Sequence, residues 1–227
     1  MLSLTPADHD AVRLSLKVAL AAMAVSLPFG FIFAYLVTFL RFRGKLLLEV
    51  FVNLPLTLPP VVIGYLLLLL LGKNGWLGPL LDLLGIRLIF TWKAAVIASA
   101  VVGFPLLVRS IRIGMESIDP QLIQASRTLG ARWYDTLVTV ILPLSLRGII
   151  AGSSLMFARS LGEFGATIIV AGSIPGVTQT IPLAIYDYAS SPGSETLALS
   201  LCVVSVALSV LVLLFHEFLG KKLARRD

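Results

Sequence analysis

Hydrophobic residues gather in five long runs that short polar stretches separate. The runs cover Leu14 to Leu40, Leu46 to Leu71, Leu88 to Val108, Gly148 to Ala171 and Thr196 to Leu219. A bilayer core about 30 Å thick takes roughly 20 helical residues to cross. Within lipid the backbone must satisfy its own hydrogen bonds, which a helix does. The pattern therefore predicts an all-α, polytopic membrane protein with five transmembrane helices.

The composition supports the same class. The chain has 227 residues, of which 58% are hydrophobic and only 13% are charged, and its mean hydropathy is +0.98. A soluble domain of this length needs more polar residues to cover its surface. Because no linker rich in Ser, Pro or Gly divides the chain, we expect residues 1–227 to form a single transmembrane domain. The first run is too long for a cleaved signal, so we expect it to remain as a span.

The basic residues indicate how the chain crosses the membrane. The net charge is +6, but the Lys and Arg residues lie at the ends of apolar runs, without the aromatic residues that a nucleic-acid surface would add. We therefore expect no nucleic-acid partner. The basic residues fall into two sets on opposite sides of the membrane, and the side with more of them is expected to be cytoplasmic. This predicts the N-terminus outside and the C-terminus inside, with the larger set on the cytoplasmic side. The larger set comprises Arg41, Arg43, Lys45, Arg109, Arg112, Arg127, Arg132, Arg147, Lys221, Lys222, Arg225 and Arg226, against Arg13, Lys17, Lys73, Arg87 and Lys93 outside.

Catalytic and metal-binding patterns are missing from the sequence. The single cysteine, Cys202, has no metal-ligand spacing around it, and His9 and His216 lie at opposite ends of the chain. No segment matches the phosphate-binding loop GxxxxGK[ST]. We therefore expect no cofactor, no metal and no catalytic residue, and an active transporter built from this chain would need a separate ATPase.

One polar segment, Gln124 to Pro143 (QASRTLGARWYDTLVTVILP), separates two of the apolar runs. Its periodicity predicts a short helix, a break at Gly130 and a second short helix. Glycine adopts backbone angles that are closed to other residues, and Pro143 does not continue a helix interior. The segment is thus expected to form a helix-turn-helix elbow outside the bilayer, on the cytoplasmic side.

This elbow resembles the cytoplasmic signature loop of ATP-binding-cassette (ABC) importer permeases. That loop reads Glu-Ala-Ala, three residues, Gly, nine residues, Ile, one residue, Leu-Pro. Here the matching positions are Ala125, Gly130, Leu142 and Pro143, with Val140 for Ile, Gln124 for Glu and Ser126 for the second Ala. The resemblance implies a coupling helix that docks in a groove of a separate ATPase subunit. The alternative is an ordinary amphipathic loop.

Within the elbow, four large side chains are candidates to fill such a groove. Arg, Trp and Tyr are frequent in the energetic centres of interfaces, but Trp and Tyr also anchor proteins to lipid headgroups. The candidates are Arg127, Arg132, Trp133 and Tyr134.

Prolines interrupt the second apolar run, in the stretch NLPLTLPPVVIG. Each proline removes a hydrogen-bond donor from the helix and favours a kink. Broken helices in transporters often border a substrate route or gate, whereas the alternative is a kink that serves packing alone. The candidate path or gate residues here are Pro55, Thr57 and Pro59.

The fourth run carries Arg159 and Glu163 one helical turn apart, with Ser160 and Thr167 nearby. A charge in mid-membrane costs at least about 2.5 to 3.5 kcal/mol, so both charges should face protein or water. One interpretation is an ion pair that fixes helix packing. The other is that Arg159 and its neighbours line the path of an anion, and the two are compatible.

Four segments, SLPFGFIFAY, LPLTLPPVVIGYLLL, ARSLGEFGATI and IPGVTQTIPLAIYD, are similar to molybdate permease subunits of ABC importers. Sulfate and tungstate permeases carry related segments. The resemblance implies the type I ABC importer permease fold in the inner membrane, a homodimer, two cytoplasmic ABC ATPase subunits and an extracytoplasmic molybdate-binding protein. The other functions considered are a membrane-embedded enzyme, which the residues do not favour, and a channel or scaffold that works without ATP.

Overall fold

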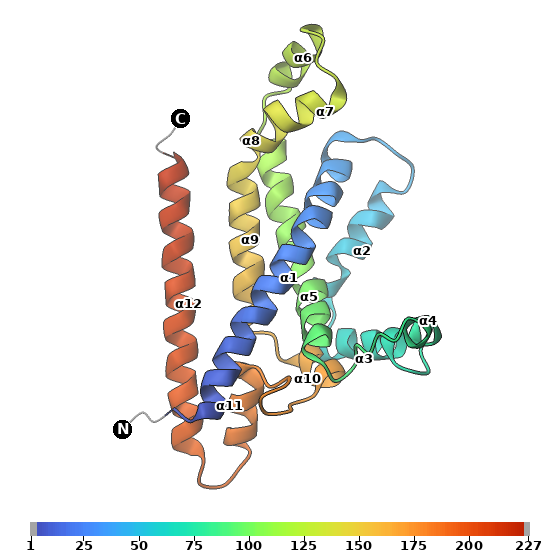
Figure 1. The fold of residues 1–227 in the computed structure, drawn as a ribbon. Coiled ribbons are helices and arrows are strands. Elements are labelled where there is room, and N and C mark those ends of the chain that lie inside the picture. Colours follow the sequence, from blue (N-terminus) through green and yellow to red (C-terminus); the bar gives the residue numbers. More distant parts are fainter. Residues whose placement is uncertain (1–3, 225–227) are drawn as a thin grey trace.

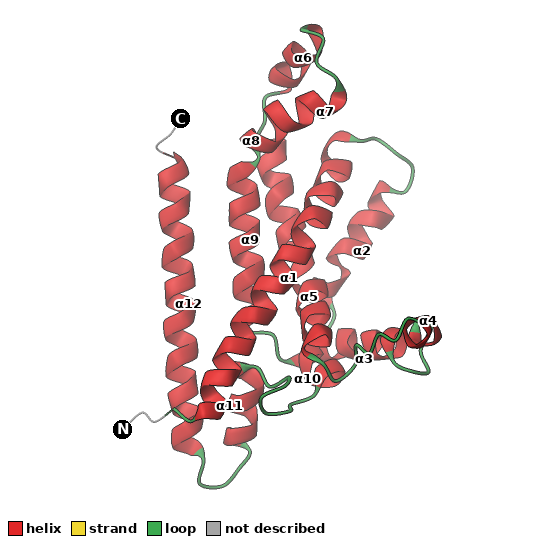
Figure 2. Cartoon of the chain, viewed as in Figure 1, coloured by secondary structure: helices red, strands yellow, loops and turns green. Residues whose placement is uncertain are grey.

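The computed structural model describes residues 4–224, with side chains described as far as residue 218. Figure 2 shows only helices and loops across this part of the chain. Arg225 and Arg226, two of the basic residues used for the orientation, lie outside the described residues. The elements are α1 (Pro6–Phe39), α2 (Lys45–Thr57), α3 (Pro60–Leu71), α4 (Gly78–Leu83), α5 (Trp92–Glu116), α6 (Pro120–Thr128), α7 (Trp133–Thr136), the π-helix η1 (Leu137–Ile141), α8 (Leu142–Leu144), α9 (Leu146–Leu161), α10 (Gly165–Ala171), α11 (Ile181–Ala189) and α12 (Glu195–Ala224).

Three of the predicted spans are single helices. Helices α1, α5 and α12 are long and apolar enough to cross a membrane. In its most apolar window α5 is 61% buried, whereas α12 is 17% buried, so α5 forms the centre of the bundle and α12 lies at its edge (Figure 1). Helix α5 begins at Trp92 and runs to Glu116, beyond the predicted end at Val108.

The other two predicted spans are broken. Helices α2 and α3 meet at an angle of 116°, and the stretch Trp133–Leu144 meets α9 at 63°. The run from Gly148 to Ala171 is also divided, because α9 ends at Leu161 and α10 begins at Gly165. The described residues thus contain three spanning helices, or up to five if each bent pair counts as one span. The kink that the prolines predict in the second run is present at 116°, whereas the break inside the fourth run, between α9 and α10, was not predicted from the sequence.

Small residues let the central helices approach closely. A methyl group added to Gly114 of α5 would lie 2.9 Å from the Cα atom of Gly148 on α9, so the two backbones touch. Helix α3 meets α10 in the same way, because a methyl group on Gly64 would lie 2.8 Å from the carbonyl oxygen of Ala166. Close approach through small residues is typical of helix packing in membranes.

The two ends of the bundle carry different features (Figure 1). Helices α6 and α7 form a projection at the end where α12 finishes, and the N-terminus lies at the opposite end, beside α11. Helices α3 and α4 extend sideways from the bundle. The chain therefore has its elbow and its C-terminus at one end and its N-terminus at the other.

Candidate functional site

The elbow has the predicted helix, break and helix. Asp119 caps α6, where its Oδ1 accepts a hydrogen bond of 2.8 Å from the backbone N–H of Gln121. Gly130 has φ +86°, a left-handed conformation that glycine adopts without strain, and it allows the chain to reverse. Helix α7 follows at Trp133, and the backbone N–H of Arg132 donates to Asp135 Oδ2 at 3.0 Å.

Polar contacts hold the two arms of the elbow together. The hydroxyls of Ser126 on α6 and Thr136 on α7 lie 3.0 Å apart, and Thr136 is buried. The backbone N–H of Ala131 also donates to the carbonyl of Ser126 at 3.1 Å. A serine at this position therefore joins the arms with a hydrogen bond that an alanine could not make.

The elbow exposes large apolar side chains alongside polar ones. Leu129 is 87% exposed and Trp133 is 66% exposed. Tyr134 is also exposed, and its hydroxyl accepts a hydrogen bond of 2.9 Å from Arg132 Nη1. Gln124, Ala125 and Arg127 are exposed on α6. Leu129 was not among the residues predicted from the sequence, although a leucine beside Gly130 in a polar segment was a signal for it.

The elbow leads into the membrane helix without the stop expected at Pro143. The chain passes through the π-helix and α8, and Pro143 occupies a helical position in α8. Proline cannot donate a hydrogen bond, and the wide turn of a π-helix directly precedes it. The bend of 63° follows before α9. Leu142 and Pro143, both exposed, thus belong to a bent but continuous connection rather than to a helix end.

Arg159 and Glu163 form the ion pair that their spacing predicts. Arg159 Nη1 lies 2.7 Å from Glu163 Oε2. The side chain of Glu163 is only 1% exposed and that of Arg159 is 32% exposed. Glu163 Oε1 also accepts a hydrogen bond of 2.8 Å from the backbone N–H of Ala166 at the start of α10. The carboxylate therefore pairs with Arg159 and also stabilises the break between α9 and α10.

The remaining path candidates occupy two environments. Ser160 and Thr167 are buried inside the chain. Thr57 is exposed at the end of α2, where its hydroxyl donates to the carbonyl of Leu54 at 2.9 Å. Pro55 lies inside α2 and Pro59 precedes α3, so the predicted kink is present as the 116° break.

At the end of the bundle opposite the elbow, polar contacts attach α11 to the first turns of α1. The hydroxyl of Tyr188 donates to Asp8 Oδ1 at 2.9 Å, and Ser15 Oγ accepts a hydrogen bond of 2.8 Å from the backbone N–H of Ile181. A hydrogen bond with Thr5 lowers the pKa of Tyr188, but burial, the hydrogen bond with Asp8 and nearby negative charge together raise it above its usual value. Tyr188 therefore stays protonated and can act as the donor.

Comparison with known proteins identifies the family. The family described as "Binding-protein-dependent transport system inner membrane component" matches residues 26–225. The chain belongs to this family. It is thus a multi-pass protein of the inner membrane, and the resemblance to ABC importer permeases noted in the sequence is confirmed.

Several relatives are similar over nearly their full length. The Molybdenum transport system permease protein ModB of Escherichia coli (strain K12) is 51% identical over 219 residues, which cover 96% of both chains. ModB of Haemophilus influenzae is 49% identical over 220 residues, also 96% of both. The Sulfate transport system permease protein CysW of Synechococcus elongatus is 37% identical over 217 residues, which cover 94% of this chain and 76% of CysW.

Solved structures share the fold. A chain of a bacterial alginate ABC transporter aligns with a TM-score of 0.77 at 15% identity, covering 96% of this chain and 80% of that one. A chain of the MetNI methionine ABC transporter aligns with a TM-score of 0.65 at 18% identity, covering 96% and 93%. The predicted fold class, an all-α ABC importer permease of type I, is confirmed.

Proposed function

We propose that this chain is the membrane subunit of an ABC importer and forms the path by which molybdate crosses the cytoplasmic membrane. The observation that carries the proposal is the similarity to two ModB proteins, at 51% and 49% identity over 96% of both lengths. The sulfate relative CysW is less similar, at 37% identity, and the match covers only 76% of the length of CysW. Tungstate and sulfate remain the alternative substrates.

The elbow is the proposed contact with a separate ATPase subunit. Leu129 and Trp133 expose large apolar surfaces outside the helix bundle, and exposed apolar patches are typical of docking sites. The hydrogen bond between Ser126 and Thr136 keeps the two arms of the elbow in one arrangement. A stiff projection that carries exposed apolar side chains can transmit a movement of its partner into the helices to which it is joined.

The proposed orientation places the elbow in the cytoplasm. Arg127 and Arg132 lie in the elbow itself, and Arg41 and Arg43 lie just beyond the end of α1 at the same end of the bundle (Figure 1). Basic residues favour the cytoplasmic side. The N-terminus is then outside and the C-terminus inside, and the elbow can reach an ATPase.

The proposed assembly has two copies of this chain, two ATPase subunits and an extracytoplasmic binding protein. The surface offered to the binding protein lies around α11, at the end opposite the elbow. Ile174, Val177 and Tyr186 are 40%, 49% and 53% exposed there. A channel or scaffold that works without ATP would not need a rigid elbow or this second surface.

The anion path is proposed to pass Arg159. Its guanidinium is partly exposed while its partner Glu163 is buried, so the carboxylate can orient Arg159 without reaching the anion. Ser160 and Thr167 are buried, and the proposal assigns them to the packing behind Arg159. The 116° break at Pro55, Thr57 and Pro59 is the proposed gate region.

ATP hydrolysis by the complete transporter in liposomes tests the substrate. The binding protein is loaded in turn with molybdate, tungstate or sulfate. The proposal predicts stimulation of hydrolysis by molybdate and tungstate and none by sulfate. Equal stimulation by sulfate would assign the chain to sulfate transport, and no stimulation by any anion would refute the importer mechanism.

A further inference from the structure

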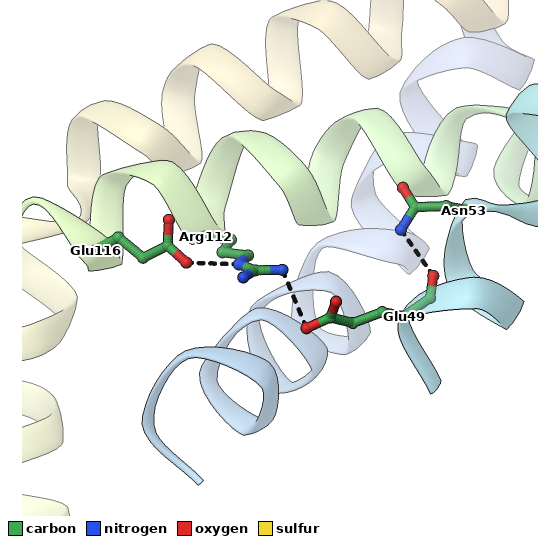
Figure 3. A network of polar contacts seen from close by, with 4 residues as sticks. All are labelled: Glu49, Asn53, Arg112 and Glu116. Carbon is green, nitrogen blue, oxygen red and sulfur yellow. Dashed lines mark hydrogen bonds and ion pairs between the residues drawn. The ribbon is translucent and has the colours of Figure 1, made fainter. Parts of the chain in front are cut away.

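Two carboxylates from different helices hold the guanidinium of Arg112 (Figure 3). Arg112 Nε donates to Glu116 Oε1 at 2.6 Å on the same helix, α5. Arg112 Nη1 lies 3.2 Å from Glu49 Oε1, which belongs to α2. On α2, Asn53 donates its Nδ2 to the carbonyl of Glu49 at 2.7 Å. Arg112 therefore connects α5 to α2, a contact that we name the Arg112 clasp.

A cavity of about 360 Å³ adjoins the clasp and suggests a second use, the binding of an oxyanion. Arg109 and Arg112 both line it, together with Glu49 and Asn53. However, the charge of Arg112 is already balanced by Glu49 and Glu116. A dianion would have to compete with two carboxylates that already contact the guanidinium, so the charges favour a connection between helices over an anion site.

The Arg112 clasp lies close to the elbow along α5 and close to the break between α2 and α3 along α2. Helix α5 ends at Glu116, only one turn beyond Arg112, and α6 of the elbow begins at Pro120. On the other helix, Glu49 precedes the end of α2 at Thr57 by eight residues, which is about 12 Å at the rise of an α-helix. A displacement of the elbow would therefore reach the end of α5 near Arg112 first, and Arg112 contacts α2 before the 116° break between α2 and α3.

Its modest burial argues against a role in folding. The side chain of Arg112 is 34% exposed and that of Glu49 is 27% exposed. Exposed ion pairs contribute little to stability, because water screens them and two long side chains must be ordered. Helix α2 has no fully buried residue and packs on the core through partly buried side chains such as Val52. The ion pair between Arg112 and Glu49 therefore adds little stability, and its main effect is to fix the position of α2 relative to α5.

We propose that Arg112 is a positioning residue of the transporter, which makes α2 move together with α5 when the elbow moves. This inference rests on the proposed function as an ABC importer. The elbow receives the movement of the ATPase, and the Arg112 clasp carries it across to the helix that ends at the proposed gate. Loss of the clasp leaves the ATPase docked but disconnects its cycle from the opening of the path.

Two matched variants, Glu49→Gln and Glu116→Gln, test the inference in the reconstituted transporter. Each removes one carboxylate from the same guanidinium, but only Glu49 connects two helices. The number of molybdate ions taken up per ATP hydrolysed should fall about fivefold or more in Glu49→Gln. It should stay near the wild-type value in Glu116→Gln, and both variants should assemble with the ATPase. A purely structural role predicts the opposite order, because the contact with Glu116 is shorter.

A second pair of variants, Arg112→Lys and Arg109→Lys, tests the same inference if Glu49→Gln does not assemble with the ATPase. Arg112→Lys keeps the charge but its ammonium cannot hold both carboxylates in the same fork, so uptake per ATP should fall. Arg109→Lys, one turn away in the same cavity wall, should leave it unchanged. If the wild-type complex takes up molybdate and neither pair differs, the clasp has no such role. If the wild-type complex takes up none, the proposed function itself fails, and the inference with it.

Discussion

Removal of Arg159 should destabilise the protein, because it leaves Glu163 without its ionic partner. Arg159 Nη1 is 2.7 Å from Glu163 Oε2, and the glutamate side chain is 1% exposed. Breaking a buried ion pair costs about 3 to 5 kcal/mol. Because Arg159 is 32% exposed and water can reach its side of the ion pair, we expect Arg159→Ala to lower the free energy of unfolding by about 2 to 4 kcal/mol.

The double variant Arg159→Ala/Glu163→Gln separates stability from transport. Glutamine removes the stranded charge and keeps a side-chain oxygen that can accept the hydrogen bond from the backbone N–H of Ala166. In thermal unfolding of the detergent-solubilised protein, the double variant should recover at least half of the stability that Arg159→Ala alone loses. Arg159→Ala as stable as the wild type, or a double variant less stable than the single one, would refute the reasoning.

Transport by the folded double variant then decides the role of Arg159. If Arg159 lines the path, the double variant assembles with the ATPase but takes up no molybdate in liposomes. If the ion pair only fixes the break between α9 and α10, the same variant transports at a rate near that of the wild type.

Three further variants test other parts of the structure. Leu129→Ala should weaken binding of the ATPase by roughly 2 kcal/mol if Leu129 is an interface centre, measured as loss of copurified ATPase. Leu83→Ala, at a leucine that is 83% exposed against 87% for Leu129, should not weaken it, and equal effects would contradict docking at the elbow. Gly148→Val should greatly reduce folded protein in size-exclusion chromatography, because its side chain would overlap the backbone of α5. Tyr188→Phe removes a hydrogen bond to the buried Asp8 and should lower thermal stability by about 1 kcal/mol, and no change would show that this contact is dispensable.

The sequence predicted the features that local pattern determines. Long apolar runs indicated α1, α5 and α12, because burial of a 20-residue helix in lipid needs no partner. The elbow was predictable from Gly130, which supplies the left-handed backbone between two short helices. The spacing of Arg159 and Glu163, one helical turn, likewise predicted their ion pair.

Other features depend on contacts between distant segments. Prolines marked the break after Thr57, but neither its angle of 116° nor the packing of Gly64 against Ala166, about 100 residues further along the chain, follows from local sequence. The division between α9 and α10 depends on a carboxylate that bonds to backbone, which hydropathy does not detect. Arg112 and Glu49 are 63 residues apart, so no local spacing could bring them together.

The most direct test of the central claim is accumulation of radiolabelled molybdate in sealed liposomes that contain this chain and its ATPase. The loaded binding protein is added outside, and ATP is trapped inside with the ATPase. The account predicts uptake against the gradient that needs both ATP and the binding protein. Molybdate that crosses equally well without ATP, or no accumulation when both are present, would contradict it.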